Sequence, residues 1–256
     1  MFEGMVVSSP AEFGAAVAAH PSANVRFQPE VLARAAASLA AAGLLVVGEP
    51  HGVRETPSVL YALTIALGTR ALALEWSHEE MDEPVQAFLR SGAFDFEALW
   101  SLPPSAEFFC GDGRIAAGHF ALLQRLRREG RLDQVIVFDR LDPKPLEVWE
   151  AQVRVREPEM AARLLAEWDQ RGPLLVLTGA FHAQLEAAEG EPMAAHLARS
   201  LPGLQPAMLD YADGHCWSRG KLHDVSGPMP KAPINFRLHG ATPAVVPGRP
   251  RASQSE

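Results

Sequence analysis

Leu44-Leu45-Val46-Val47-Gly48-Glu49-Pro50-His51 joins a short apolar run to polar residues that follow it directly. The apolar residues predict a buried β-strand that ends at Gly48. Runs of the same kind occur at 71–74, 135–138 and 174–177, and stretches with helical spacing of apolar residues separate them. This alternation predicts an α/β fold with a mainly parallel sheet and helices on both of its faces.

Capping residues and apolar spacing predict the intervening helices. Thr56 suits the N-cap of one helix, because Pro57 then occupies the first helical position. Further helices are expected over residues 80–90 and 115–130. Pro158 is expected to start another helix, since proline is tolerated best in the first turn.

Length and composition favour one main domain. The chain has 256 residues, of which 48% are apolar, so a sizeable core can form. We expect a single α/β domain over residues 1–225. Residues 226–256 are rich in Pro and Gly and are expected to form a C-terminal extension, with a flexible tail after Pro243.

Charge and cysteine content exclude several classes of protein. Acidic residues outnumber basic ones by 31 to 23, which argues against a nucleic-acid groove. Cys110 and Cys216 show neither metal-ligand spacing nor a disulfide framework, which favours the reducing cytoplasm. No apolar run reaches the ~18 residues of a membrane span, so no membrane association is expected. The expected partner is a small-molecule substrate, and the oligomeric state is left open.

Polar residues follow the ends of all the predicted strands. Glu49 and His51 follow the first strand, Glu75 ends the second, Asp139 follows the third and His182 follows the fourth. Because ligands of parallel sheets bind beyond the carboxyl ends of the strands, these side chains are expected to converge. The sequence therefore predicts an active site at the C-terminal edge of the sheet.

Common catalytic motifs do not account for this pattern. The sequence has no G-x-S-x-G elbow, no Walker loop and no G-x-G-x-x-G after a strand. The segment His78-Glu79-Glu80-Met81-Asp82 lacks the second histidine of a zincin helix. The predicted chemistry therefore depends on His51, Glu75 and His182.

Several short motifs resemble a known family. They are Gly48-Glu49-Pro50-His51-Gly52, Leu72-Ala73-Leu74-Glu75-Trp76, Asp112-Gly113-Arg114, Arg156-Glu157-Pro158-Glu159-Met160-Ala161 and Leu177-Thr178-Gly179-Ala180-Phe181-His182-Ala183. In order and spacing they resemble the erythromycin esterase and ChaN-like superfamily, which includes the Tiki and TraB proteins. The resemblance covers about residues 44–185.

This resemblance implies an esterase-like hydrolase that needs no cofactor. His51 matches the general base that activates a water, and Glu75 matches the carboxylate that orients the base or the water. Arg156 and His182 would contact the substrate carbonyl and stabilise the oxyanion, a role in which preorganised donors are effective. The residues expected to bind substrate are Glu49, Arg54, Asp112, Arg114 and Asp139.

Other interpretations of the same residues stay open. His51, Glu75 and His182 could instead bind a divalent metal, since two imidazoles and a carboxylate suit Zn, Mn or Fe. A non-catalytic module that binds a small molecule is a third possibility. Haem binding, which the ChaN branch implies, is disfavoured because Tyr61 and Tyr211 lie outside the motifs.

Two further segments bear on the substrate. Only about twenty residues separate Phe138 from Pro158, so the long helical insertions of the larger esterases are missing. A smaller ester, lactone or amide is therefore expected in place of a macrolide. The polar cluster His215, Cys216 and His223 is expected to be either a surface loop or a lid over the site.

Overall fold

The computed structural model describes residues 5–140 and 148–249, and a six-stranded sheet forms its centre. In spatial order the strands are β4 (Gln134–Asp139), β3 (Ala71–Ser77), β5 (Leu174–Gly179), β2 (Leu44–Glu49), β6 (Ala207–Tyr211) and β9 (Ile234–Leu238). All neighbouring pairs are parallel. The predicted α/β fold and its four strands are confirmed. β5 lies between β2 and β3, so strands that are consecutive along the chain are not always neighbours.

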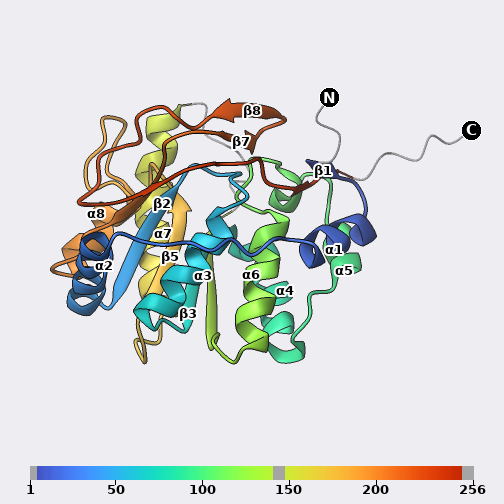
Figure 1. The fold of residues 1–256 in the computed structure, drawn as a ribbon, viewed down its shortest axis with the longest axis horizontal. Helices are drawn as coiled ribbons and strands as arrows, with labels where there is room; N and C mark the ends of the chain where they lie inside the picture. The colour runs from blue at the N-terminus through green and yellow to red at the C-terminus, as the bar shows by residue number, and fades with distance from the viewer. Residues whose placement is uncertain (1–4, 141–147, 250–256) are drawn as a thin grey trace, which may run out of the picture.

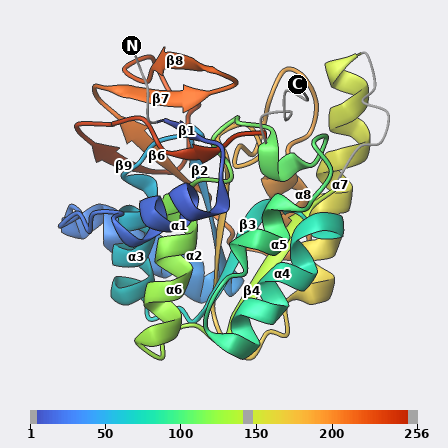
Figure 2. The same cartoon turned by 90° about the vertical axis from the view of Figure 1, so that its right-hand side faces the viewer.

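Helices cover both faces of the sheet (Figure 2). On one face lie α2 (Pro29–Ala42), α3 (Thr56–Leu67) and α6 (Ala117–Arg128), with α1 (Pro10–Ala18), α4 (His78–Ser91), α5 (Phe96–Trp100) and the short helix η1 (Glu107–Phe109) in the same core cluster. The opposite face is covered by α7 (Trp149–Glu167) and α8 (Met193–Ser200).

Strand β2 shows why the sheet strands are continuously apolar. Leu45 and Val47 point into the core beneath α2 and α3, whereas Leu44 and Val46 point into the core beneath α7 and α8. All four side chains are fully buried. A strand with both faces covered has no solvent-facing position, and therefore its sequence does not alternate.

The sheet extends beyond the expected domain boundary after residue 225. β9 pairs with β6 along its whole length and forms an edge of the central sheet. The expected tail after Pro243 also contains structure, because β10 (Val246–Pro247) pairs with β1 (Val6–Val7) and Val246 is fully buried. The part of residues 226–256 that the structure describes therefore completes the α/β unit.

Helix α7 differs from the prediction at its start. It begins at Trp149 and continues through Pro158, which was expected to be its first residue. Val153, Glu157, Met160 and Leu164 lie on one face of this helix and are all buried. Packing of this face offsets the backbone hydrogen bond that proline removes.

Helix α3 begins at the expected place with a different cap. Thr56 is its first helical residue, Glu55 occupies the N-cap position and Pro57 follows Thr56. The Thr56 hydroxyl lies 3.1 Å from the Tyr211 hydroxyl, so it bonds a side chain of β6 in place of the helix backbone.

An antiparallel hairpin lies beyond the end of the central strands (Figure 1). It consists of β7 (His215–Ser218) and β8 (Lys221–Asp224), joined by Arg219 and Gly220. None of the helices in the described part of the chain is both long enough and apolar enough to cross a membrane.

Candidate active site

Carboxylates from three strands of the sheet lie at its C-terminal edge. Glu49 ends β2, Glu75 lies near the end of β3 and Asp139 ends β4. Their exposed fractions are 2%, 3% and 1% respectively. Buried carboxylates need hydrogen-bonding or cationic partners, and here histidines and arginines supply most of them.

His51 lies on the loop after β2 between two of these carboxylates. Its Nδ1 is 3.2 Å from Glu49 Oε1, and its Nε2 is 3.7 Å from Glu75 Oε2. Because an ionised carboxylate can only accept, Nδ1 carries the proton in this pair. Glu49 thus fixes the orientation of the ring. Nε2 faces Glu75, and the 3.7 Å between them is longer than a hydrogen bond. The His51 side chain is 19% exposed.

Glu75 accepts hydrogen bonds on both of its carboxylate oxygens. Its Oε2 accepts hydrogen bonds from the Thr178 hydroxyl and the Gly179 amide, both at 2.6 Å. Its Oε1 lies 2.9 Å from Arg156 Nη2 and 3.3 Å from His182 Nε2. Burial alone would raise the pKa of Glu75, but nearby cations, with His182 and Arg114 foremost, hold it well below its usual value.

A fourth carboxylate, that of Glu157, orients His182. Nδ1 of His182 lies 2.8 Å from each carboxylate oxygen of Glu157, which is fully buried in α7. The Met193 amide also donates to Glu157, at 2.8 Å. Nε2 of His182 therefore points toward Glu75, and it lies 3.4 Å from Arg156 Nη1.

Asp139 joins the two arginines of the site. Arg156 donates to it from Nε at 2.8 Å and from Nη2 at 2.5 Å, and Arg114 donates from Nη1 at 2.8 Å. Arg114 also donates from Nε to Asp112 at 2.7 Å and from Nη1 to Glu107 at 2.9 Å. Such charge-assisted, multiply bonded guanidinium groups are rigid.

Both histidines are more basic than usual. Burial lowers the pKa of His51, but Glu49 and Glu75 outweigh burial and raise it to about 10. The pKa of His182 is also raised, because Glu75 and Glu157 outweigh burial. Burial raises the pKa of Glu107 to about 8, although Arg114 opposes this. With a pKa of about 10, His51 is mostly an imidazolium at neutral pH in the resting site.

The sequence-predicted residues occupy three kinds of place. His51, Glu75, Arg156 and His182 form one connected cluster. Glu49 and Asp139, expected to bind substrate, are instead buried beneath the cluster and hold His51 and the arginines. Arg54 is exposed and lines a different cavity with His20, so it does not join the cluster.

Two residues of the site, the buried Glu157 and the partly exposed Glu107, were not predicted as site residues. Glu157 lies inside the Arg156–Ala161 motif, and its place next to Arg156 was the available signal. Glu107 comes from η1, and its carboxylate accepts from the Ser77 amide at 2.5 Å as well as from Arg114. No motif marks Glu107 in the sequence.

A cavity of about 390 Å³ opens beside the cluster. It is lined by His51, Asp112, Arg114, Ser218, Arg219, Lys221 and His223. The last four residues belong to the β7–β8 hairpin. Of the polar cluster for which a surface loop or a lid was expected, His223 lines the cavity, His215 is exposed and Cys216 is buried.

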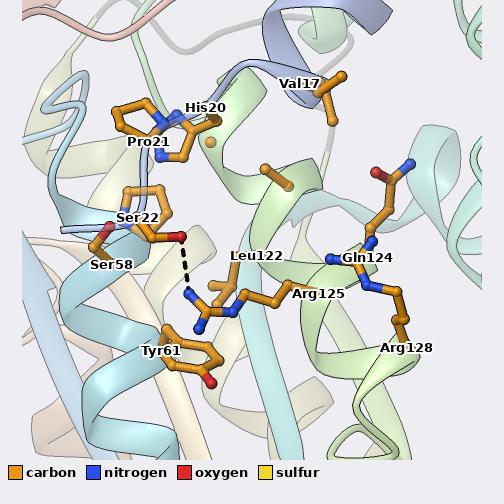
Figure 3. Close-up of a pocket in the computed structure, with 14 residues that line it drawn as sticks. Val17, His20, Pro21, Ser22, Ser58, Tyr61, Leu122, Gln124, Arg125 and Arg128 are labelled. Atoms are coloured by element: carbon orange, nitrogen blue, oxygen red, sulfur yellow. Dashed lines mark hydrogen bonds between the residues drawn. The ribbon is translucent and has the colours of Figure 1, made fainter. Parts of the chain in front are cut away.

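A separate pocket lies between α1, α3 and α6 (Figure 3). In it the Arg125 guanidinium lies 3.6 Å from the centre of the Tyr61 ring and donates to the Ser22 hydroxyl at 3.0 Å. His20 also lines this pocket, whereas none of the predicted site residues does. The pocket is therefore distinct from the His51 cluster.

Comparison with known proteins identifies a shared fold. No protein-family model matches the chain, and no curated protein matches it in sequence. A Bacillus cereus protein, structural-genomics target BcR135, is 9% identical, with a TM-score of 0.60 over 82% of this chain and 91% of the other. At this identity the similarity extends to the fold alone.

Two bacterial effectors are more distant in structure. The toxin effector domain RRSP of Vibrio vulnificus is 17% identical, with a TM-score of 0.48 over 77% of this chain and 37% of the other. The type III effector HopBA1 is 18% identical, with a TM-score of 0.46 over 75% and 87%. Since no family model and no curated protein matches the chain, the resemblance to the erythromycin esterase and ChaN-like superfamily depends on the sequence motifs.

Proposed function

We propose that the protein is a hydrolase that cleaves an ester, lactone or amide of a small molecule with a water activated at His51. The observation that supports this most directly is the setting of His51. Its Nδ1 is held by Glu49, its Nε2 stands 3.7 Å from Glu75, and the ring lines the cavity. A histidine whose second nitrogen is fixed by a carboxylate is the usual form of a general base.

The proposed reaction has two steps. Nε2 of His51 removes a proton from water while the water oxygen bonds the carbonyl carbon, and the carbonyl oxygen becomes an oxyanion. The carbon–oxygen or carbon–nitrogen bond to the leaving group then breaks, and His51 returns its proton to the departing atom. The products are a carboxylic acid and an alcohol or amine, so atoms and charge balance.

Arg156 and His182 are the proposed oxyanion donors. The Arg156 side chain is 18% exposed, and its Nη1 is the nitrogen that faces His182 Nε2. Asp139 and Glu157 hold these two side chains in place before substrate arrives. Donors that are already oriented need no reorganisation in the transition state, and each is commonly worth ~3 kcal/mol.

The raised pKa of His51 predicts an alkaline enzyme. Only the neutral imidazole can accept a proton, and a pKa of about 10 leaves it in the minority at pH 7. We therefore expect kcat/KM to increase about tenfold per pH unit between pH 7 and 9. A flat profile across this range would contradict the assignment of His51 as the base.

A metal-dependent hydrolase remains the alternative proposal, and the donor set does not favour it. Within the described residues, no group of three His, Cys, Asp or Glu side chains is arranged to hold a metal ion. Both oxygens of Glu75 already accept hydrogen bonds, including one from the Arg156 guanidinium. A divalent cation would have to displace these donors and lie beside a guanidinium.

Turnover of 4-nitrophenyl esters and simple lactones tests the proposal. His51→Gln and Glu75→Gln should abolish turnover while circular dichroism shows a native fold. His239→Gln is the matched control, because this histidine is 74% exposed and contacts Asp213. Full turnover in both site variants would show that the base assignment is wrong.

Loss of wild-type activity in a chelator would favour the metal alternative, and saturable ligand binding without turnover would favour a binding module.

A further inference from the structure

The wall of the cavity that faces His51 carries an unusual charge for this protein. The chain has a formal net charge of −8, yet the cavity lining includes Arg114, Arg219 and Lys221 with Asp112 as its one carboxylate among the described residues. Asp112 is already paired with Arg114 Nε at 2.7 Å. A surplus of cations therefore surrounds the opening.

The β7–β8 hairpin is anchored to the two loops that form the site. The Trp217 amide donates to the Gly52 carbonyl at 3.0 Å, and the Arg219 amide donates to the Gly111 carbonyl at 2.8 Å. Gly52 directly follows His51, and Gly111 directly precedes Asp112. These bonds fix the hairpin turn beside the catalytic cluster.

Arg219 occupies a backbone conformation that its residue type disfavours. The two-residue turn has positive φ at both positions, 51° at Arg219 and 77° at Gly220. This geometry belongs to a type I′ turn, in which Asn, Asp or Gly is preferred at the first position. A residue held in an unfavourable conformation at the rim of a site points to a functional role for its side chain.

Arg114 also has capacity for a ligand. In the described part of the chain its Nε and Nη1 donate to Asp112, Glu107 and Asp139, and no hydrogen bond involves its Nη2. Its side chain is 14% exposed and lines the same cavity as Arg219 and Lys221. A guanidinium held in this way can present a nitrogen to an oxyanion without moving.

From this juxtaposition we propose that Arg219 and Lys221, together with Arg114, form a subsite for a carboxylate or phosphate group of the substrate. The subsite lies beside His51, so it would hold a substrate whose scissile carbonyl is near an anionic group. The inference rests on the proposed function, because it names the substrate class of the same site.

Two esters with the same leaving group test the inference. We expect 4-nitrophenyl hemisuccinate to have a KM about tenfold lower than that of the neutral 4-nitrophenyl butyrate. In the double variant Arg219→Asn/Lys221→Gln this preference should disappear, because the KM of the hemisuccinate ester should rise to that of the butyrate ester. Asn suits positive φ, so the hairpin turn is retained. An undiminished preference in the double variant would overturn the inference.

A matched control separates local binding from net charge. Arg131→Gln/Arg171→Gln removes the same two charges from exposed positions that precede β4 and β5, at the opposite edge of the sheet. This variant should keep the preference for the hemisuccinate ester. If it loses the preference as fully as the hairpin variant does, the effect comes from overall charge and the subsite is wrong.

Direct binding distinguishes this inference from the proposed hydrolysis. Titration of inorganic phosphate and of succinate, followed by calorimetry, should show saturable binding that weakens about tenfold in the hairpin variant. Tighter binding of phosphate or of succinate shows whether the subsite prefers a phosphate or a carboxylate group. Binding without turnover of either ester would support the subsite and refute the hydrolase. Equal turnover of both esters without anion binding would support the hydrolase and refute the subsite.

Discussion

The backbone amide of Trp217 lies 3.0 Å from the carbonyl oxygen of Gly52, and this hydrogen bond joins the β7–β8 hairpin to the residue directly after His51. The approach is so close that a Cβ on Gly52 would lie 1.8 Å from the Trp217 carbonyl oxygen. Gly52 also has a φ of +82°. Only glycine meets both requirements at this position.

Gly52→Ala should therefore destabilise the protein and displace the hairpin. We expect the free energy of unfolding in urea to decrease by at least about 2 kcal/mol, since backbone strain and steric clash add. Gly68→Ala is the control. Gly68 has a φ of +66°, and its Cβ would meet no atom within 4 Å, so only a conformational penalty of about 1 kcal/mol is expected. Equal losses in the two variants would show that the contact with Trp217 is unimportant.

Glu157→Gln tests the carboxylate that orients His182. The side chain is fully buried and accepts from His182 Nδ1 and from the Met193 amide. Loss of its charge should lower the free energy of unfolding by about 1.5–3 kcal/mol. Glu159→Gln, two residues along the same helix, removes a half-exposed partner of Arg140 and should cost about 1 kcal/mol or less. A Glu157 variant as stable as the Glu159 variant would contradict this role.

The raised pKa of His51 predicts how stability changes with pH. The folded-state pKa of about 10 lies above the unfolded value of about 6.5, so the folded protein binds the extra proton between these limits. This contribution is complete below pH 6.5 and is lost as pH rises toward 10. Between pH 6 and 9, wild type should lose about 2–3 kcal/mol more unfolding free energy than His51→Gln. Parallel curves for the two proteins would show that His51 is not held as an imidazolium.

The buried His119 should make the stability of the protein depend on pH in the opposite direction. It is 2% exposed, neither ring nitrogen has a hydrogen-bond partner in the described structure, and burial lowers its pKa to about 4. The unfolded chain binds the extra proton between pH 6.5 and 4, so this histidine lowers stability as pH falls through that range.

His119→Phe should remove this acid sensitivity. From pH 7 to pH 5 the wild type should lose about 2 kcal/mol more unfolding free energy than the variant. At pH 7 the variant should be at least as stable, since an apolar ring suits the contact with Trp76, whose ring centre lies 6.2 Å away. Identical acid sensitivity in both proteins would mean that His119 titrates normally.

Local patterns in the sequence were sufficient for the layers of the fold. The apolar runs at 44–47 and 174–177 became neighbouring strands, because a strand covered on both faces must be apolar at every position. Strand β9 was missed since Ile234 and Phe236 alternate with exposed residues, as expected at a sheet edge, within a segment rich in Pro and Gly. The start of α7 was missed because buried contacts outweigh the preference of Pro158 for a first turn.

The sequence by itself determined that Glu49, His51, Glu75, Asp139 and His182 would gather at one edge, because all parallel strands end there. Only the tertiary structure decided their roles. Glu49 holds Nδ1 of His51, and Glu157 holds His182. A supporting carboxylate differs from an exposed one in its distances to other groups and in its burial, and both exist only once the chain has folded. The β7–β8 hairpin likewise reaches His51 through backbone bonds to Gly52 and Gly111, and backbone hydrogen bonds carry no residue signature.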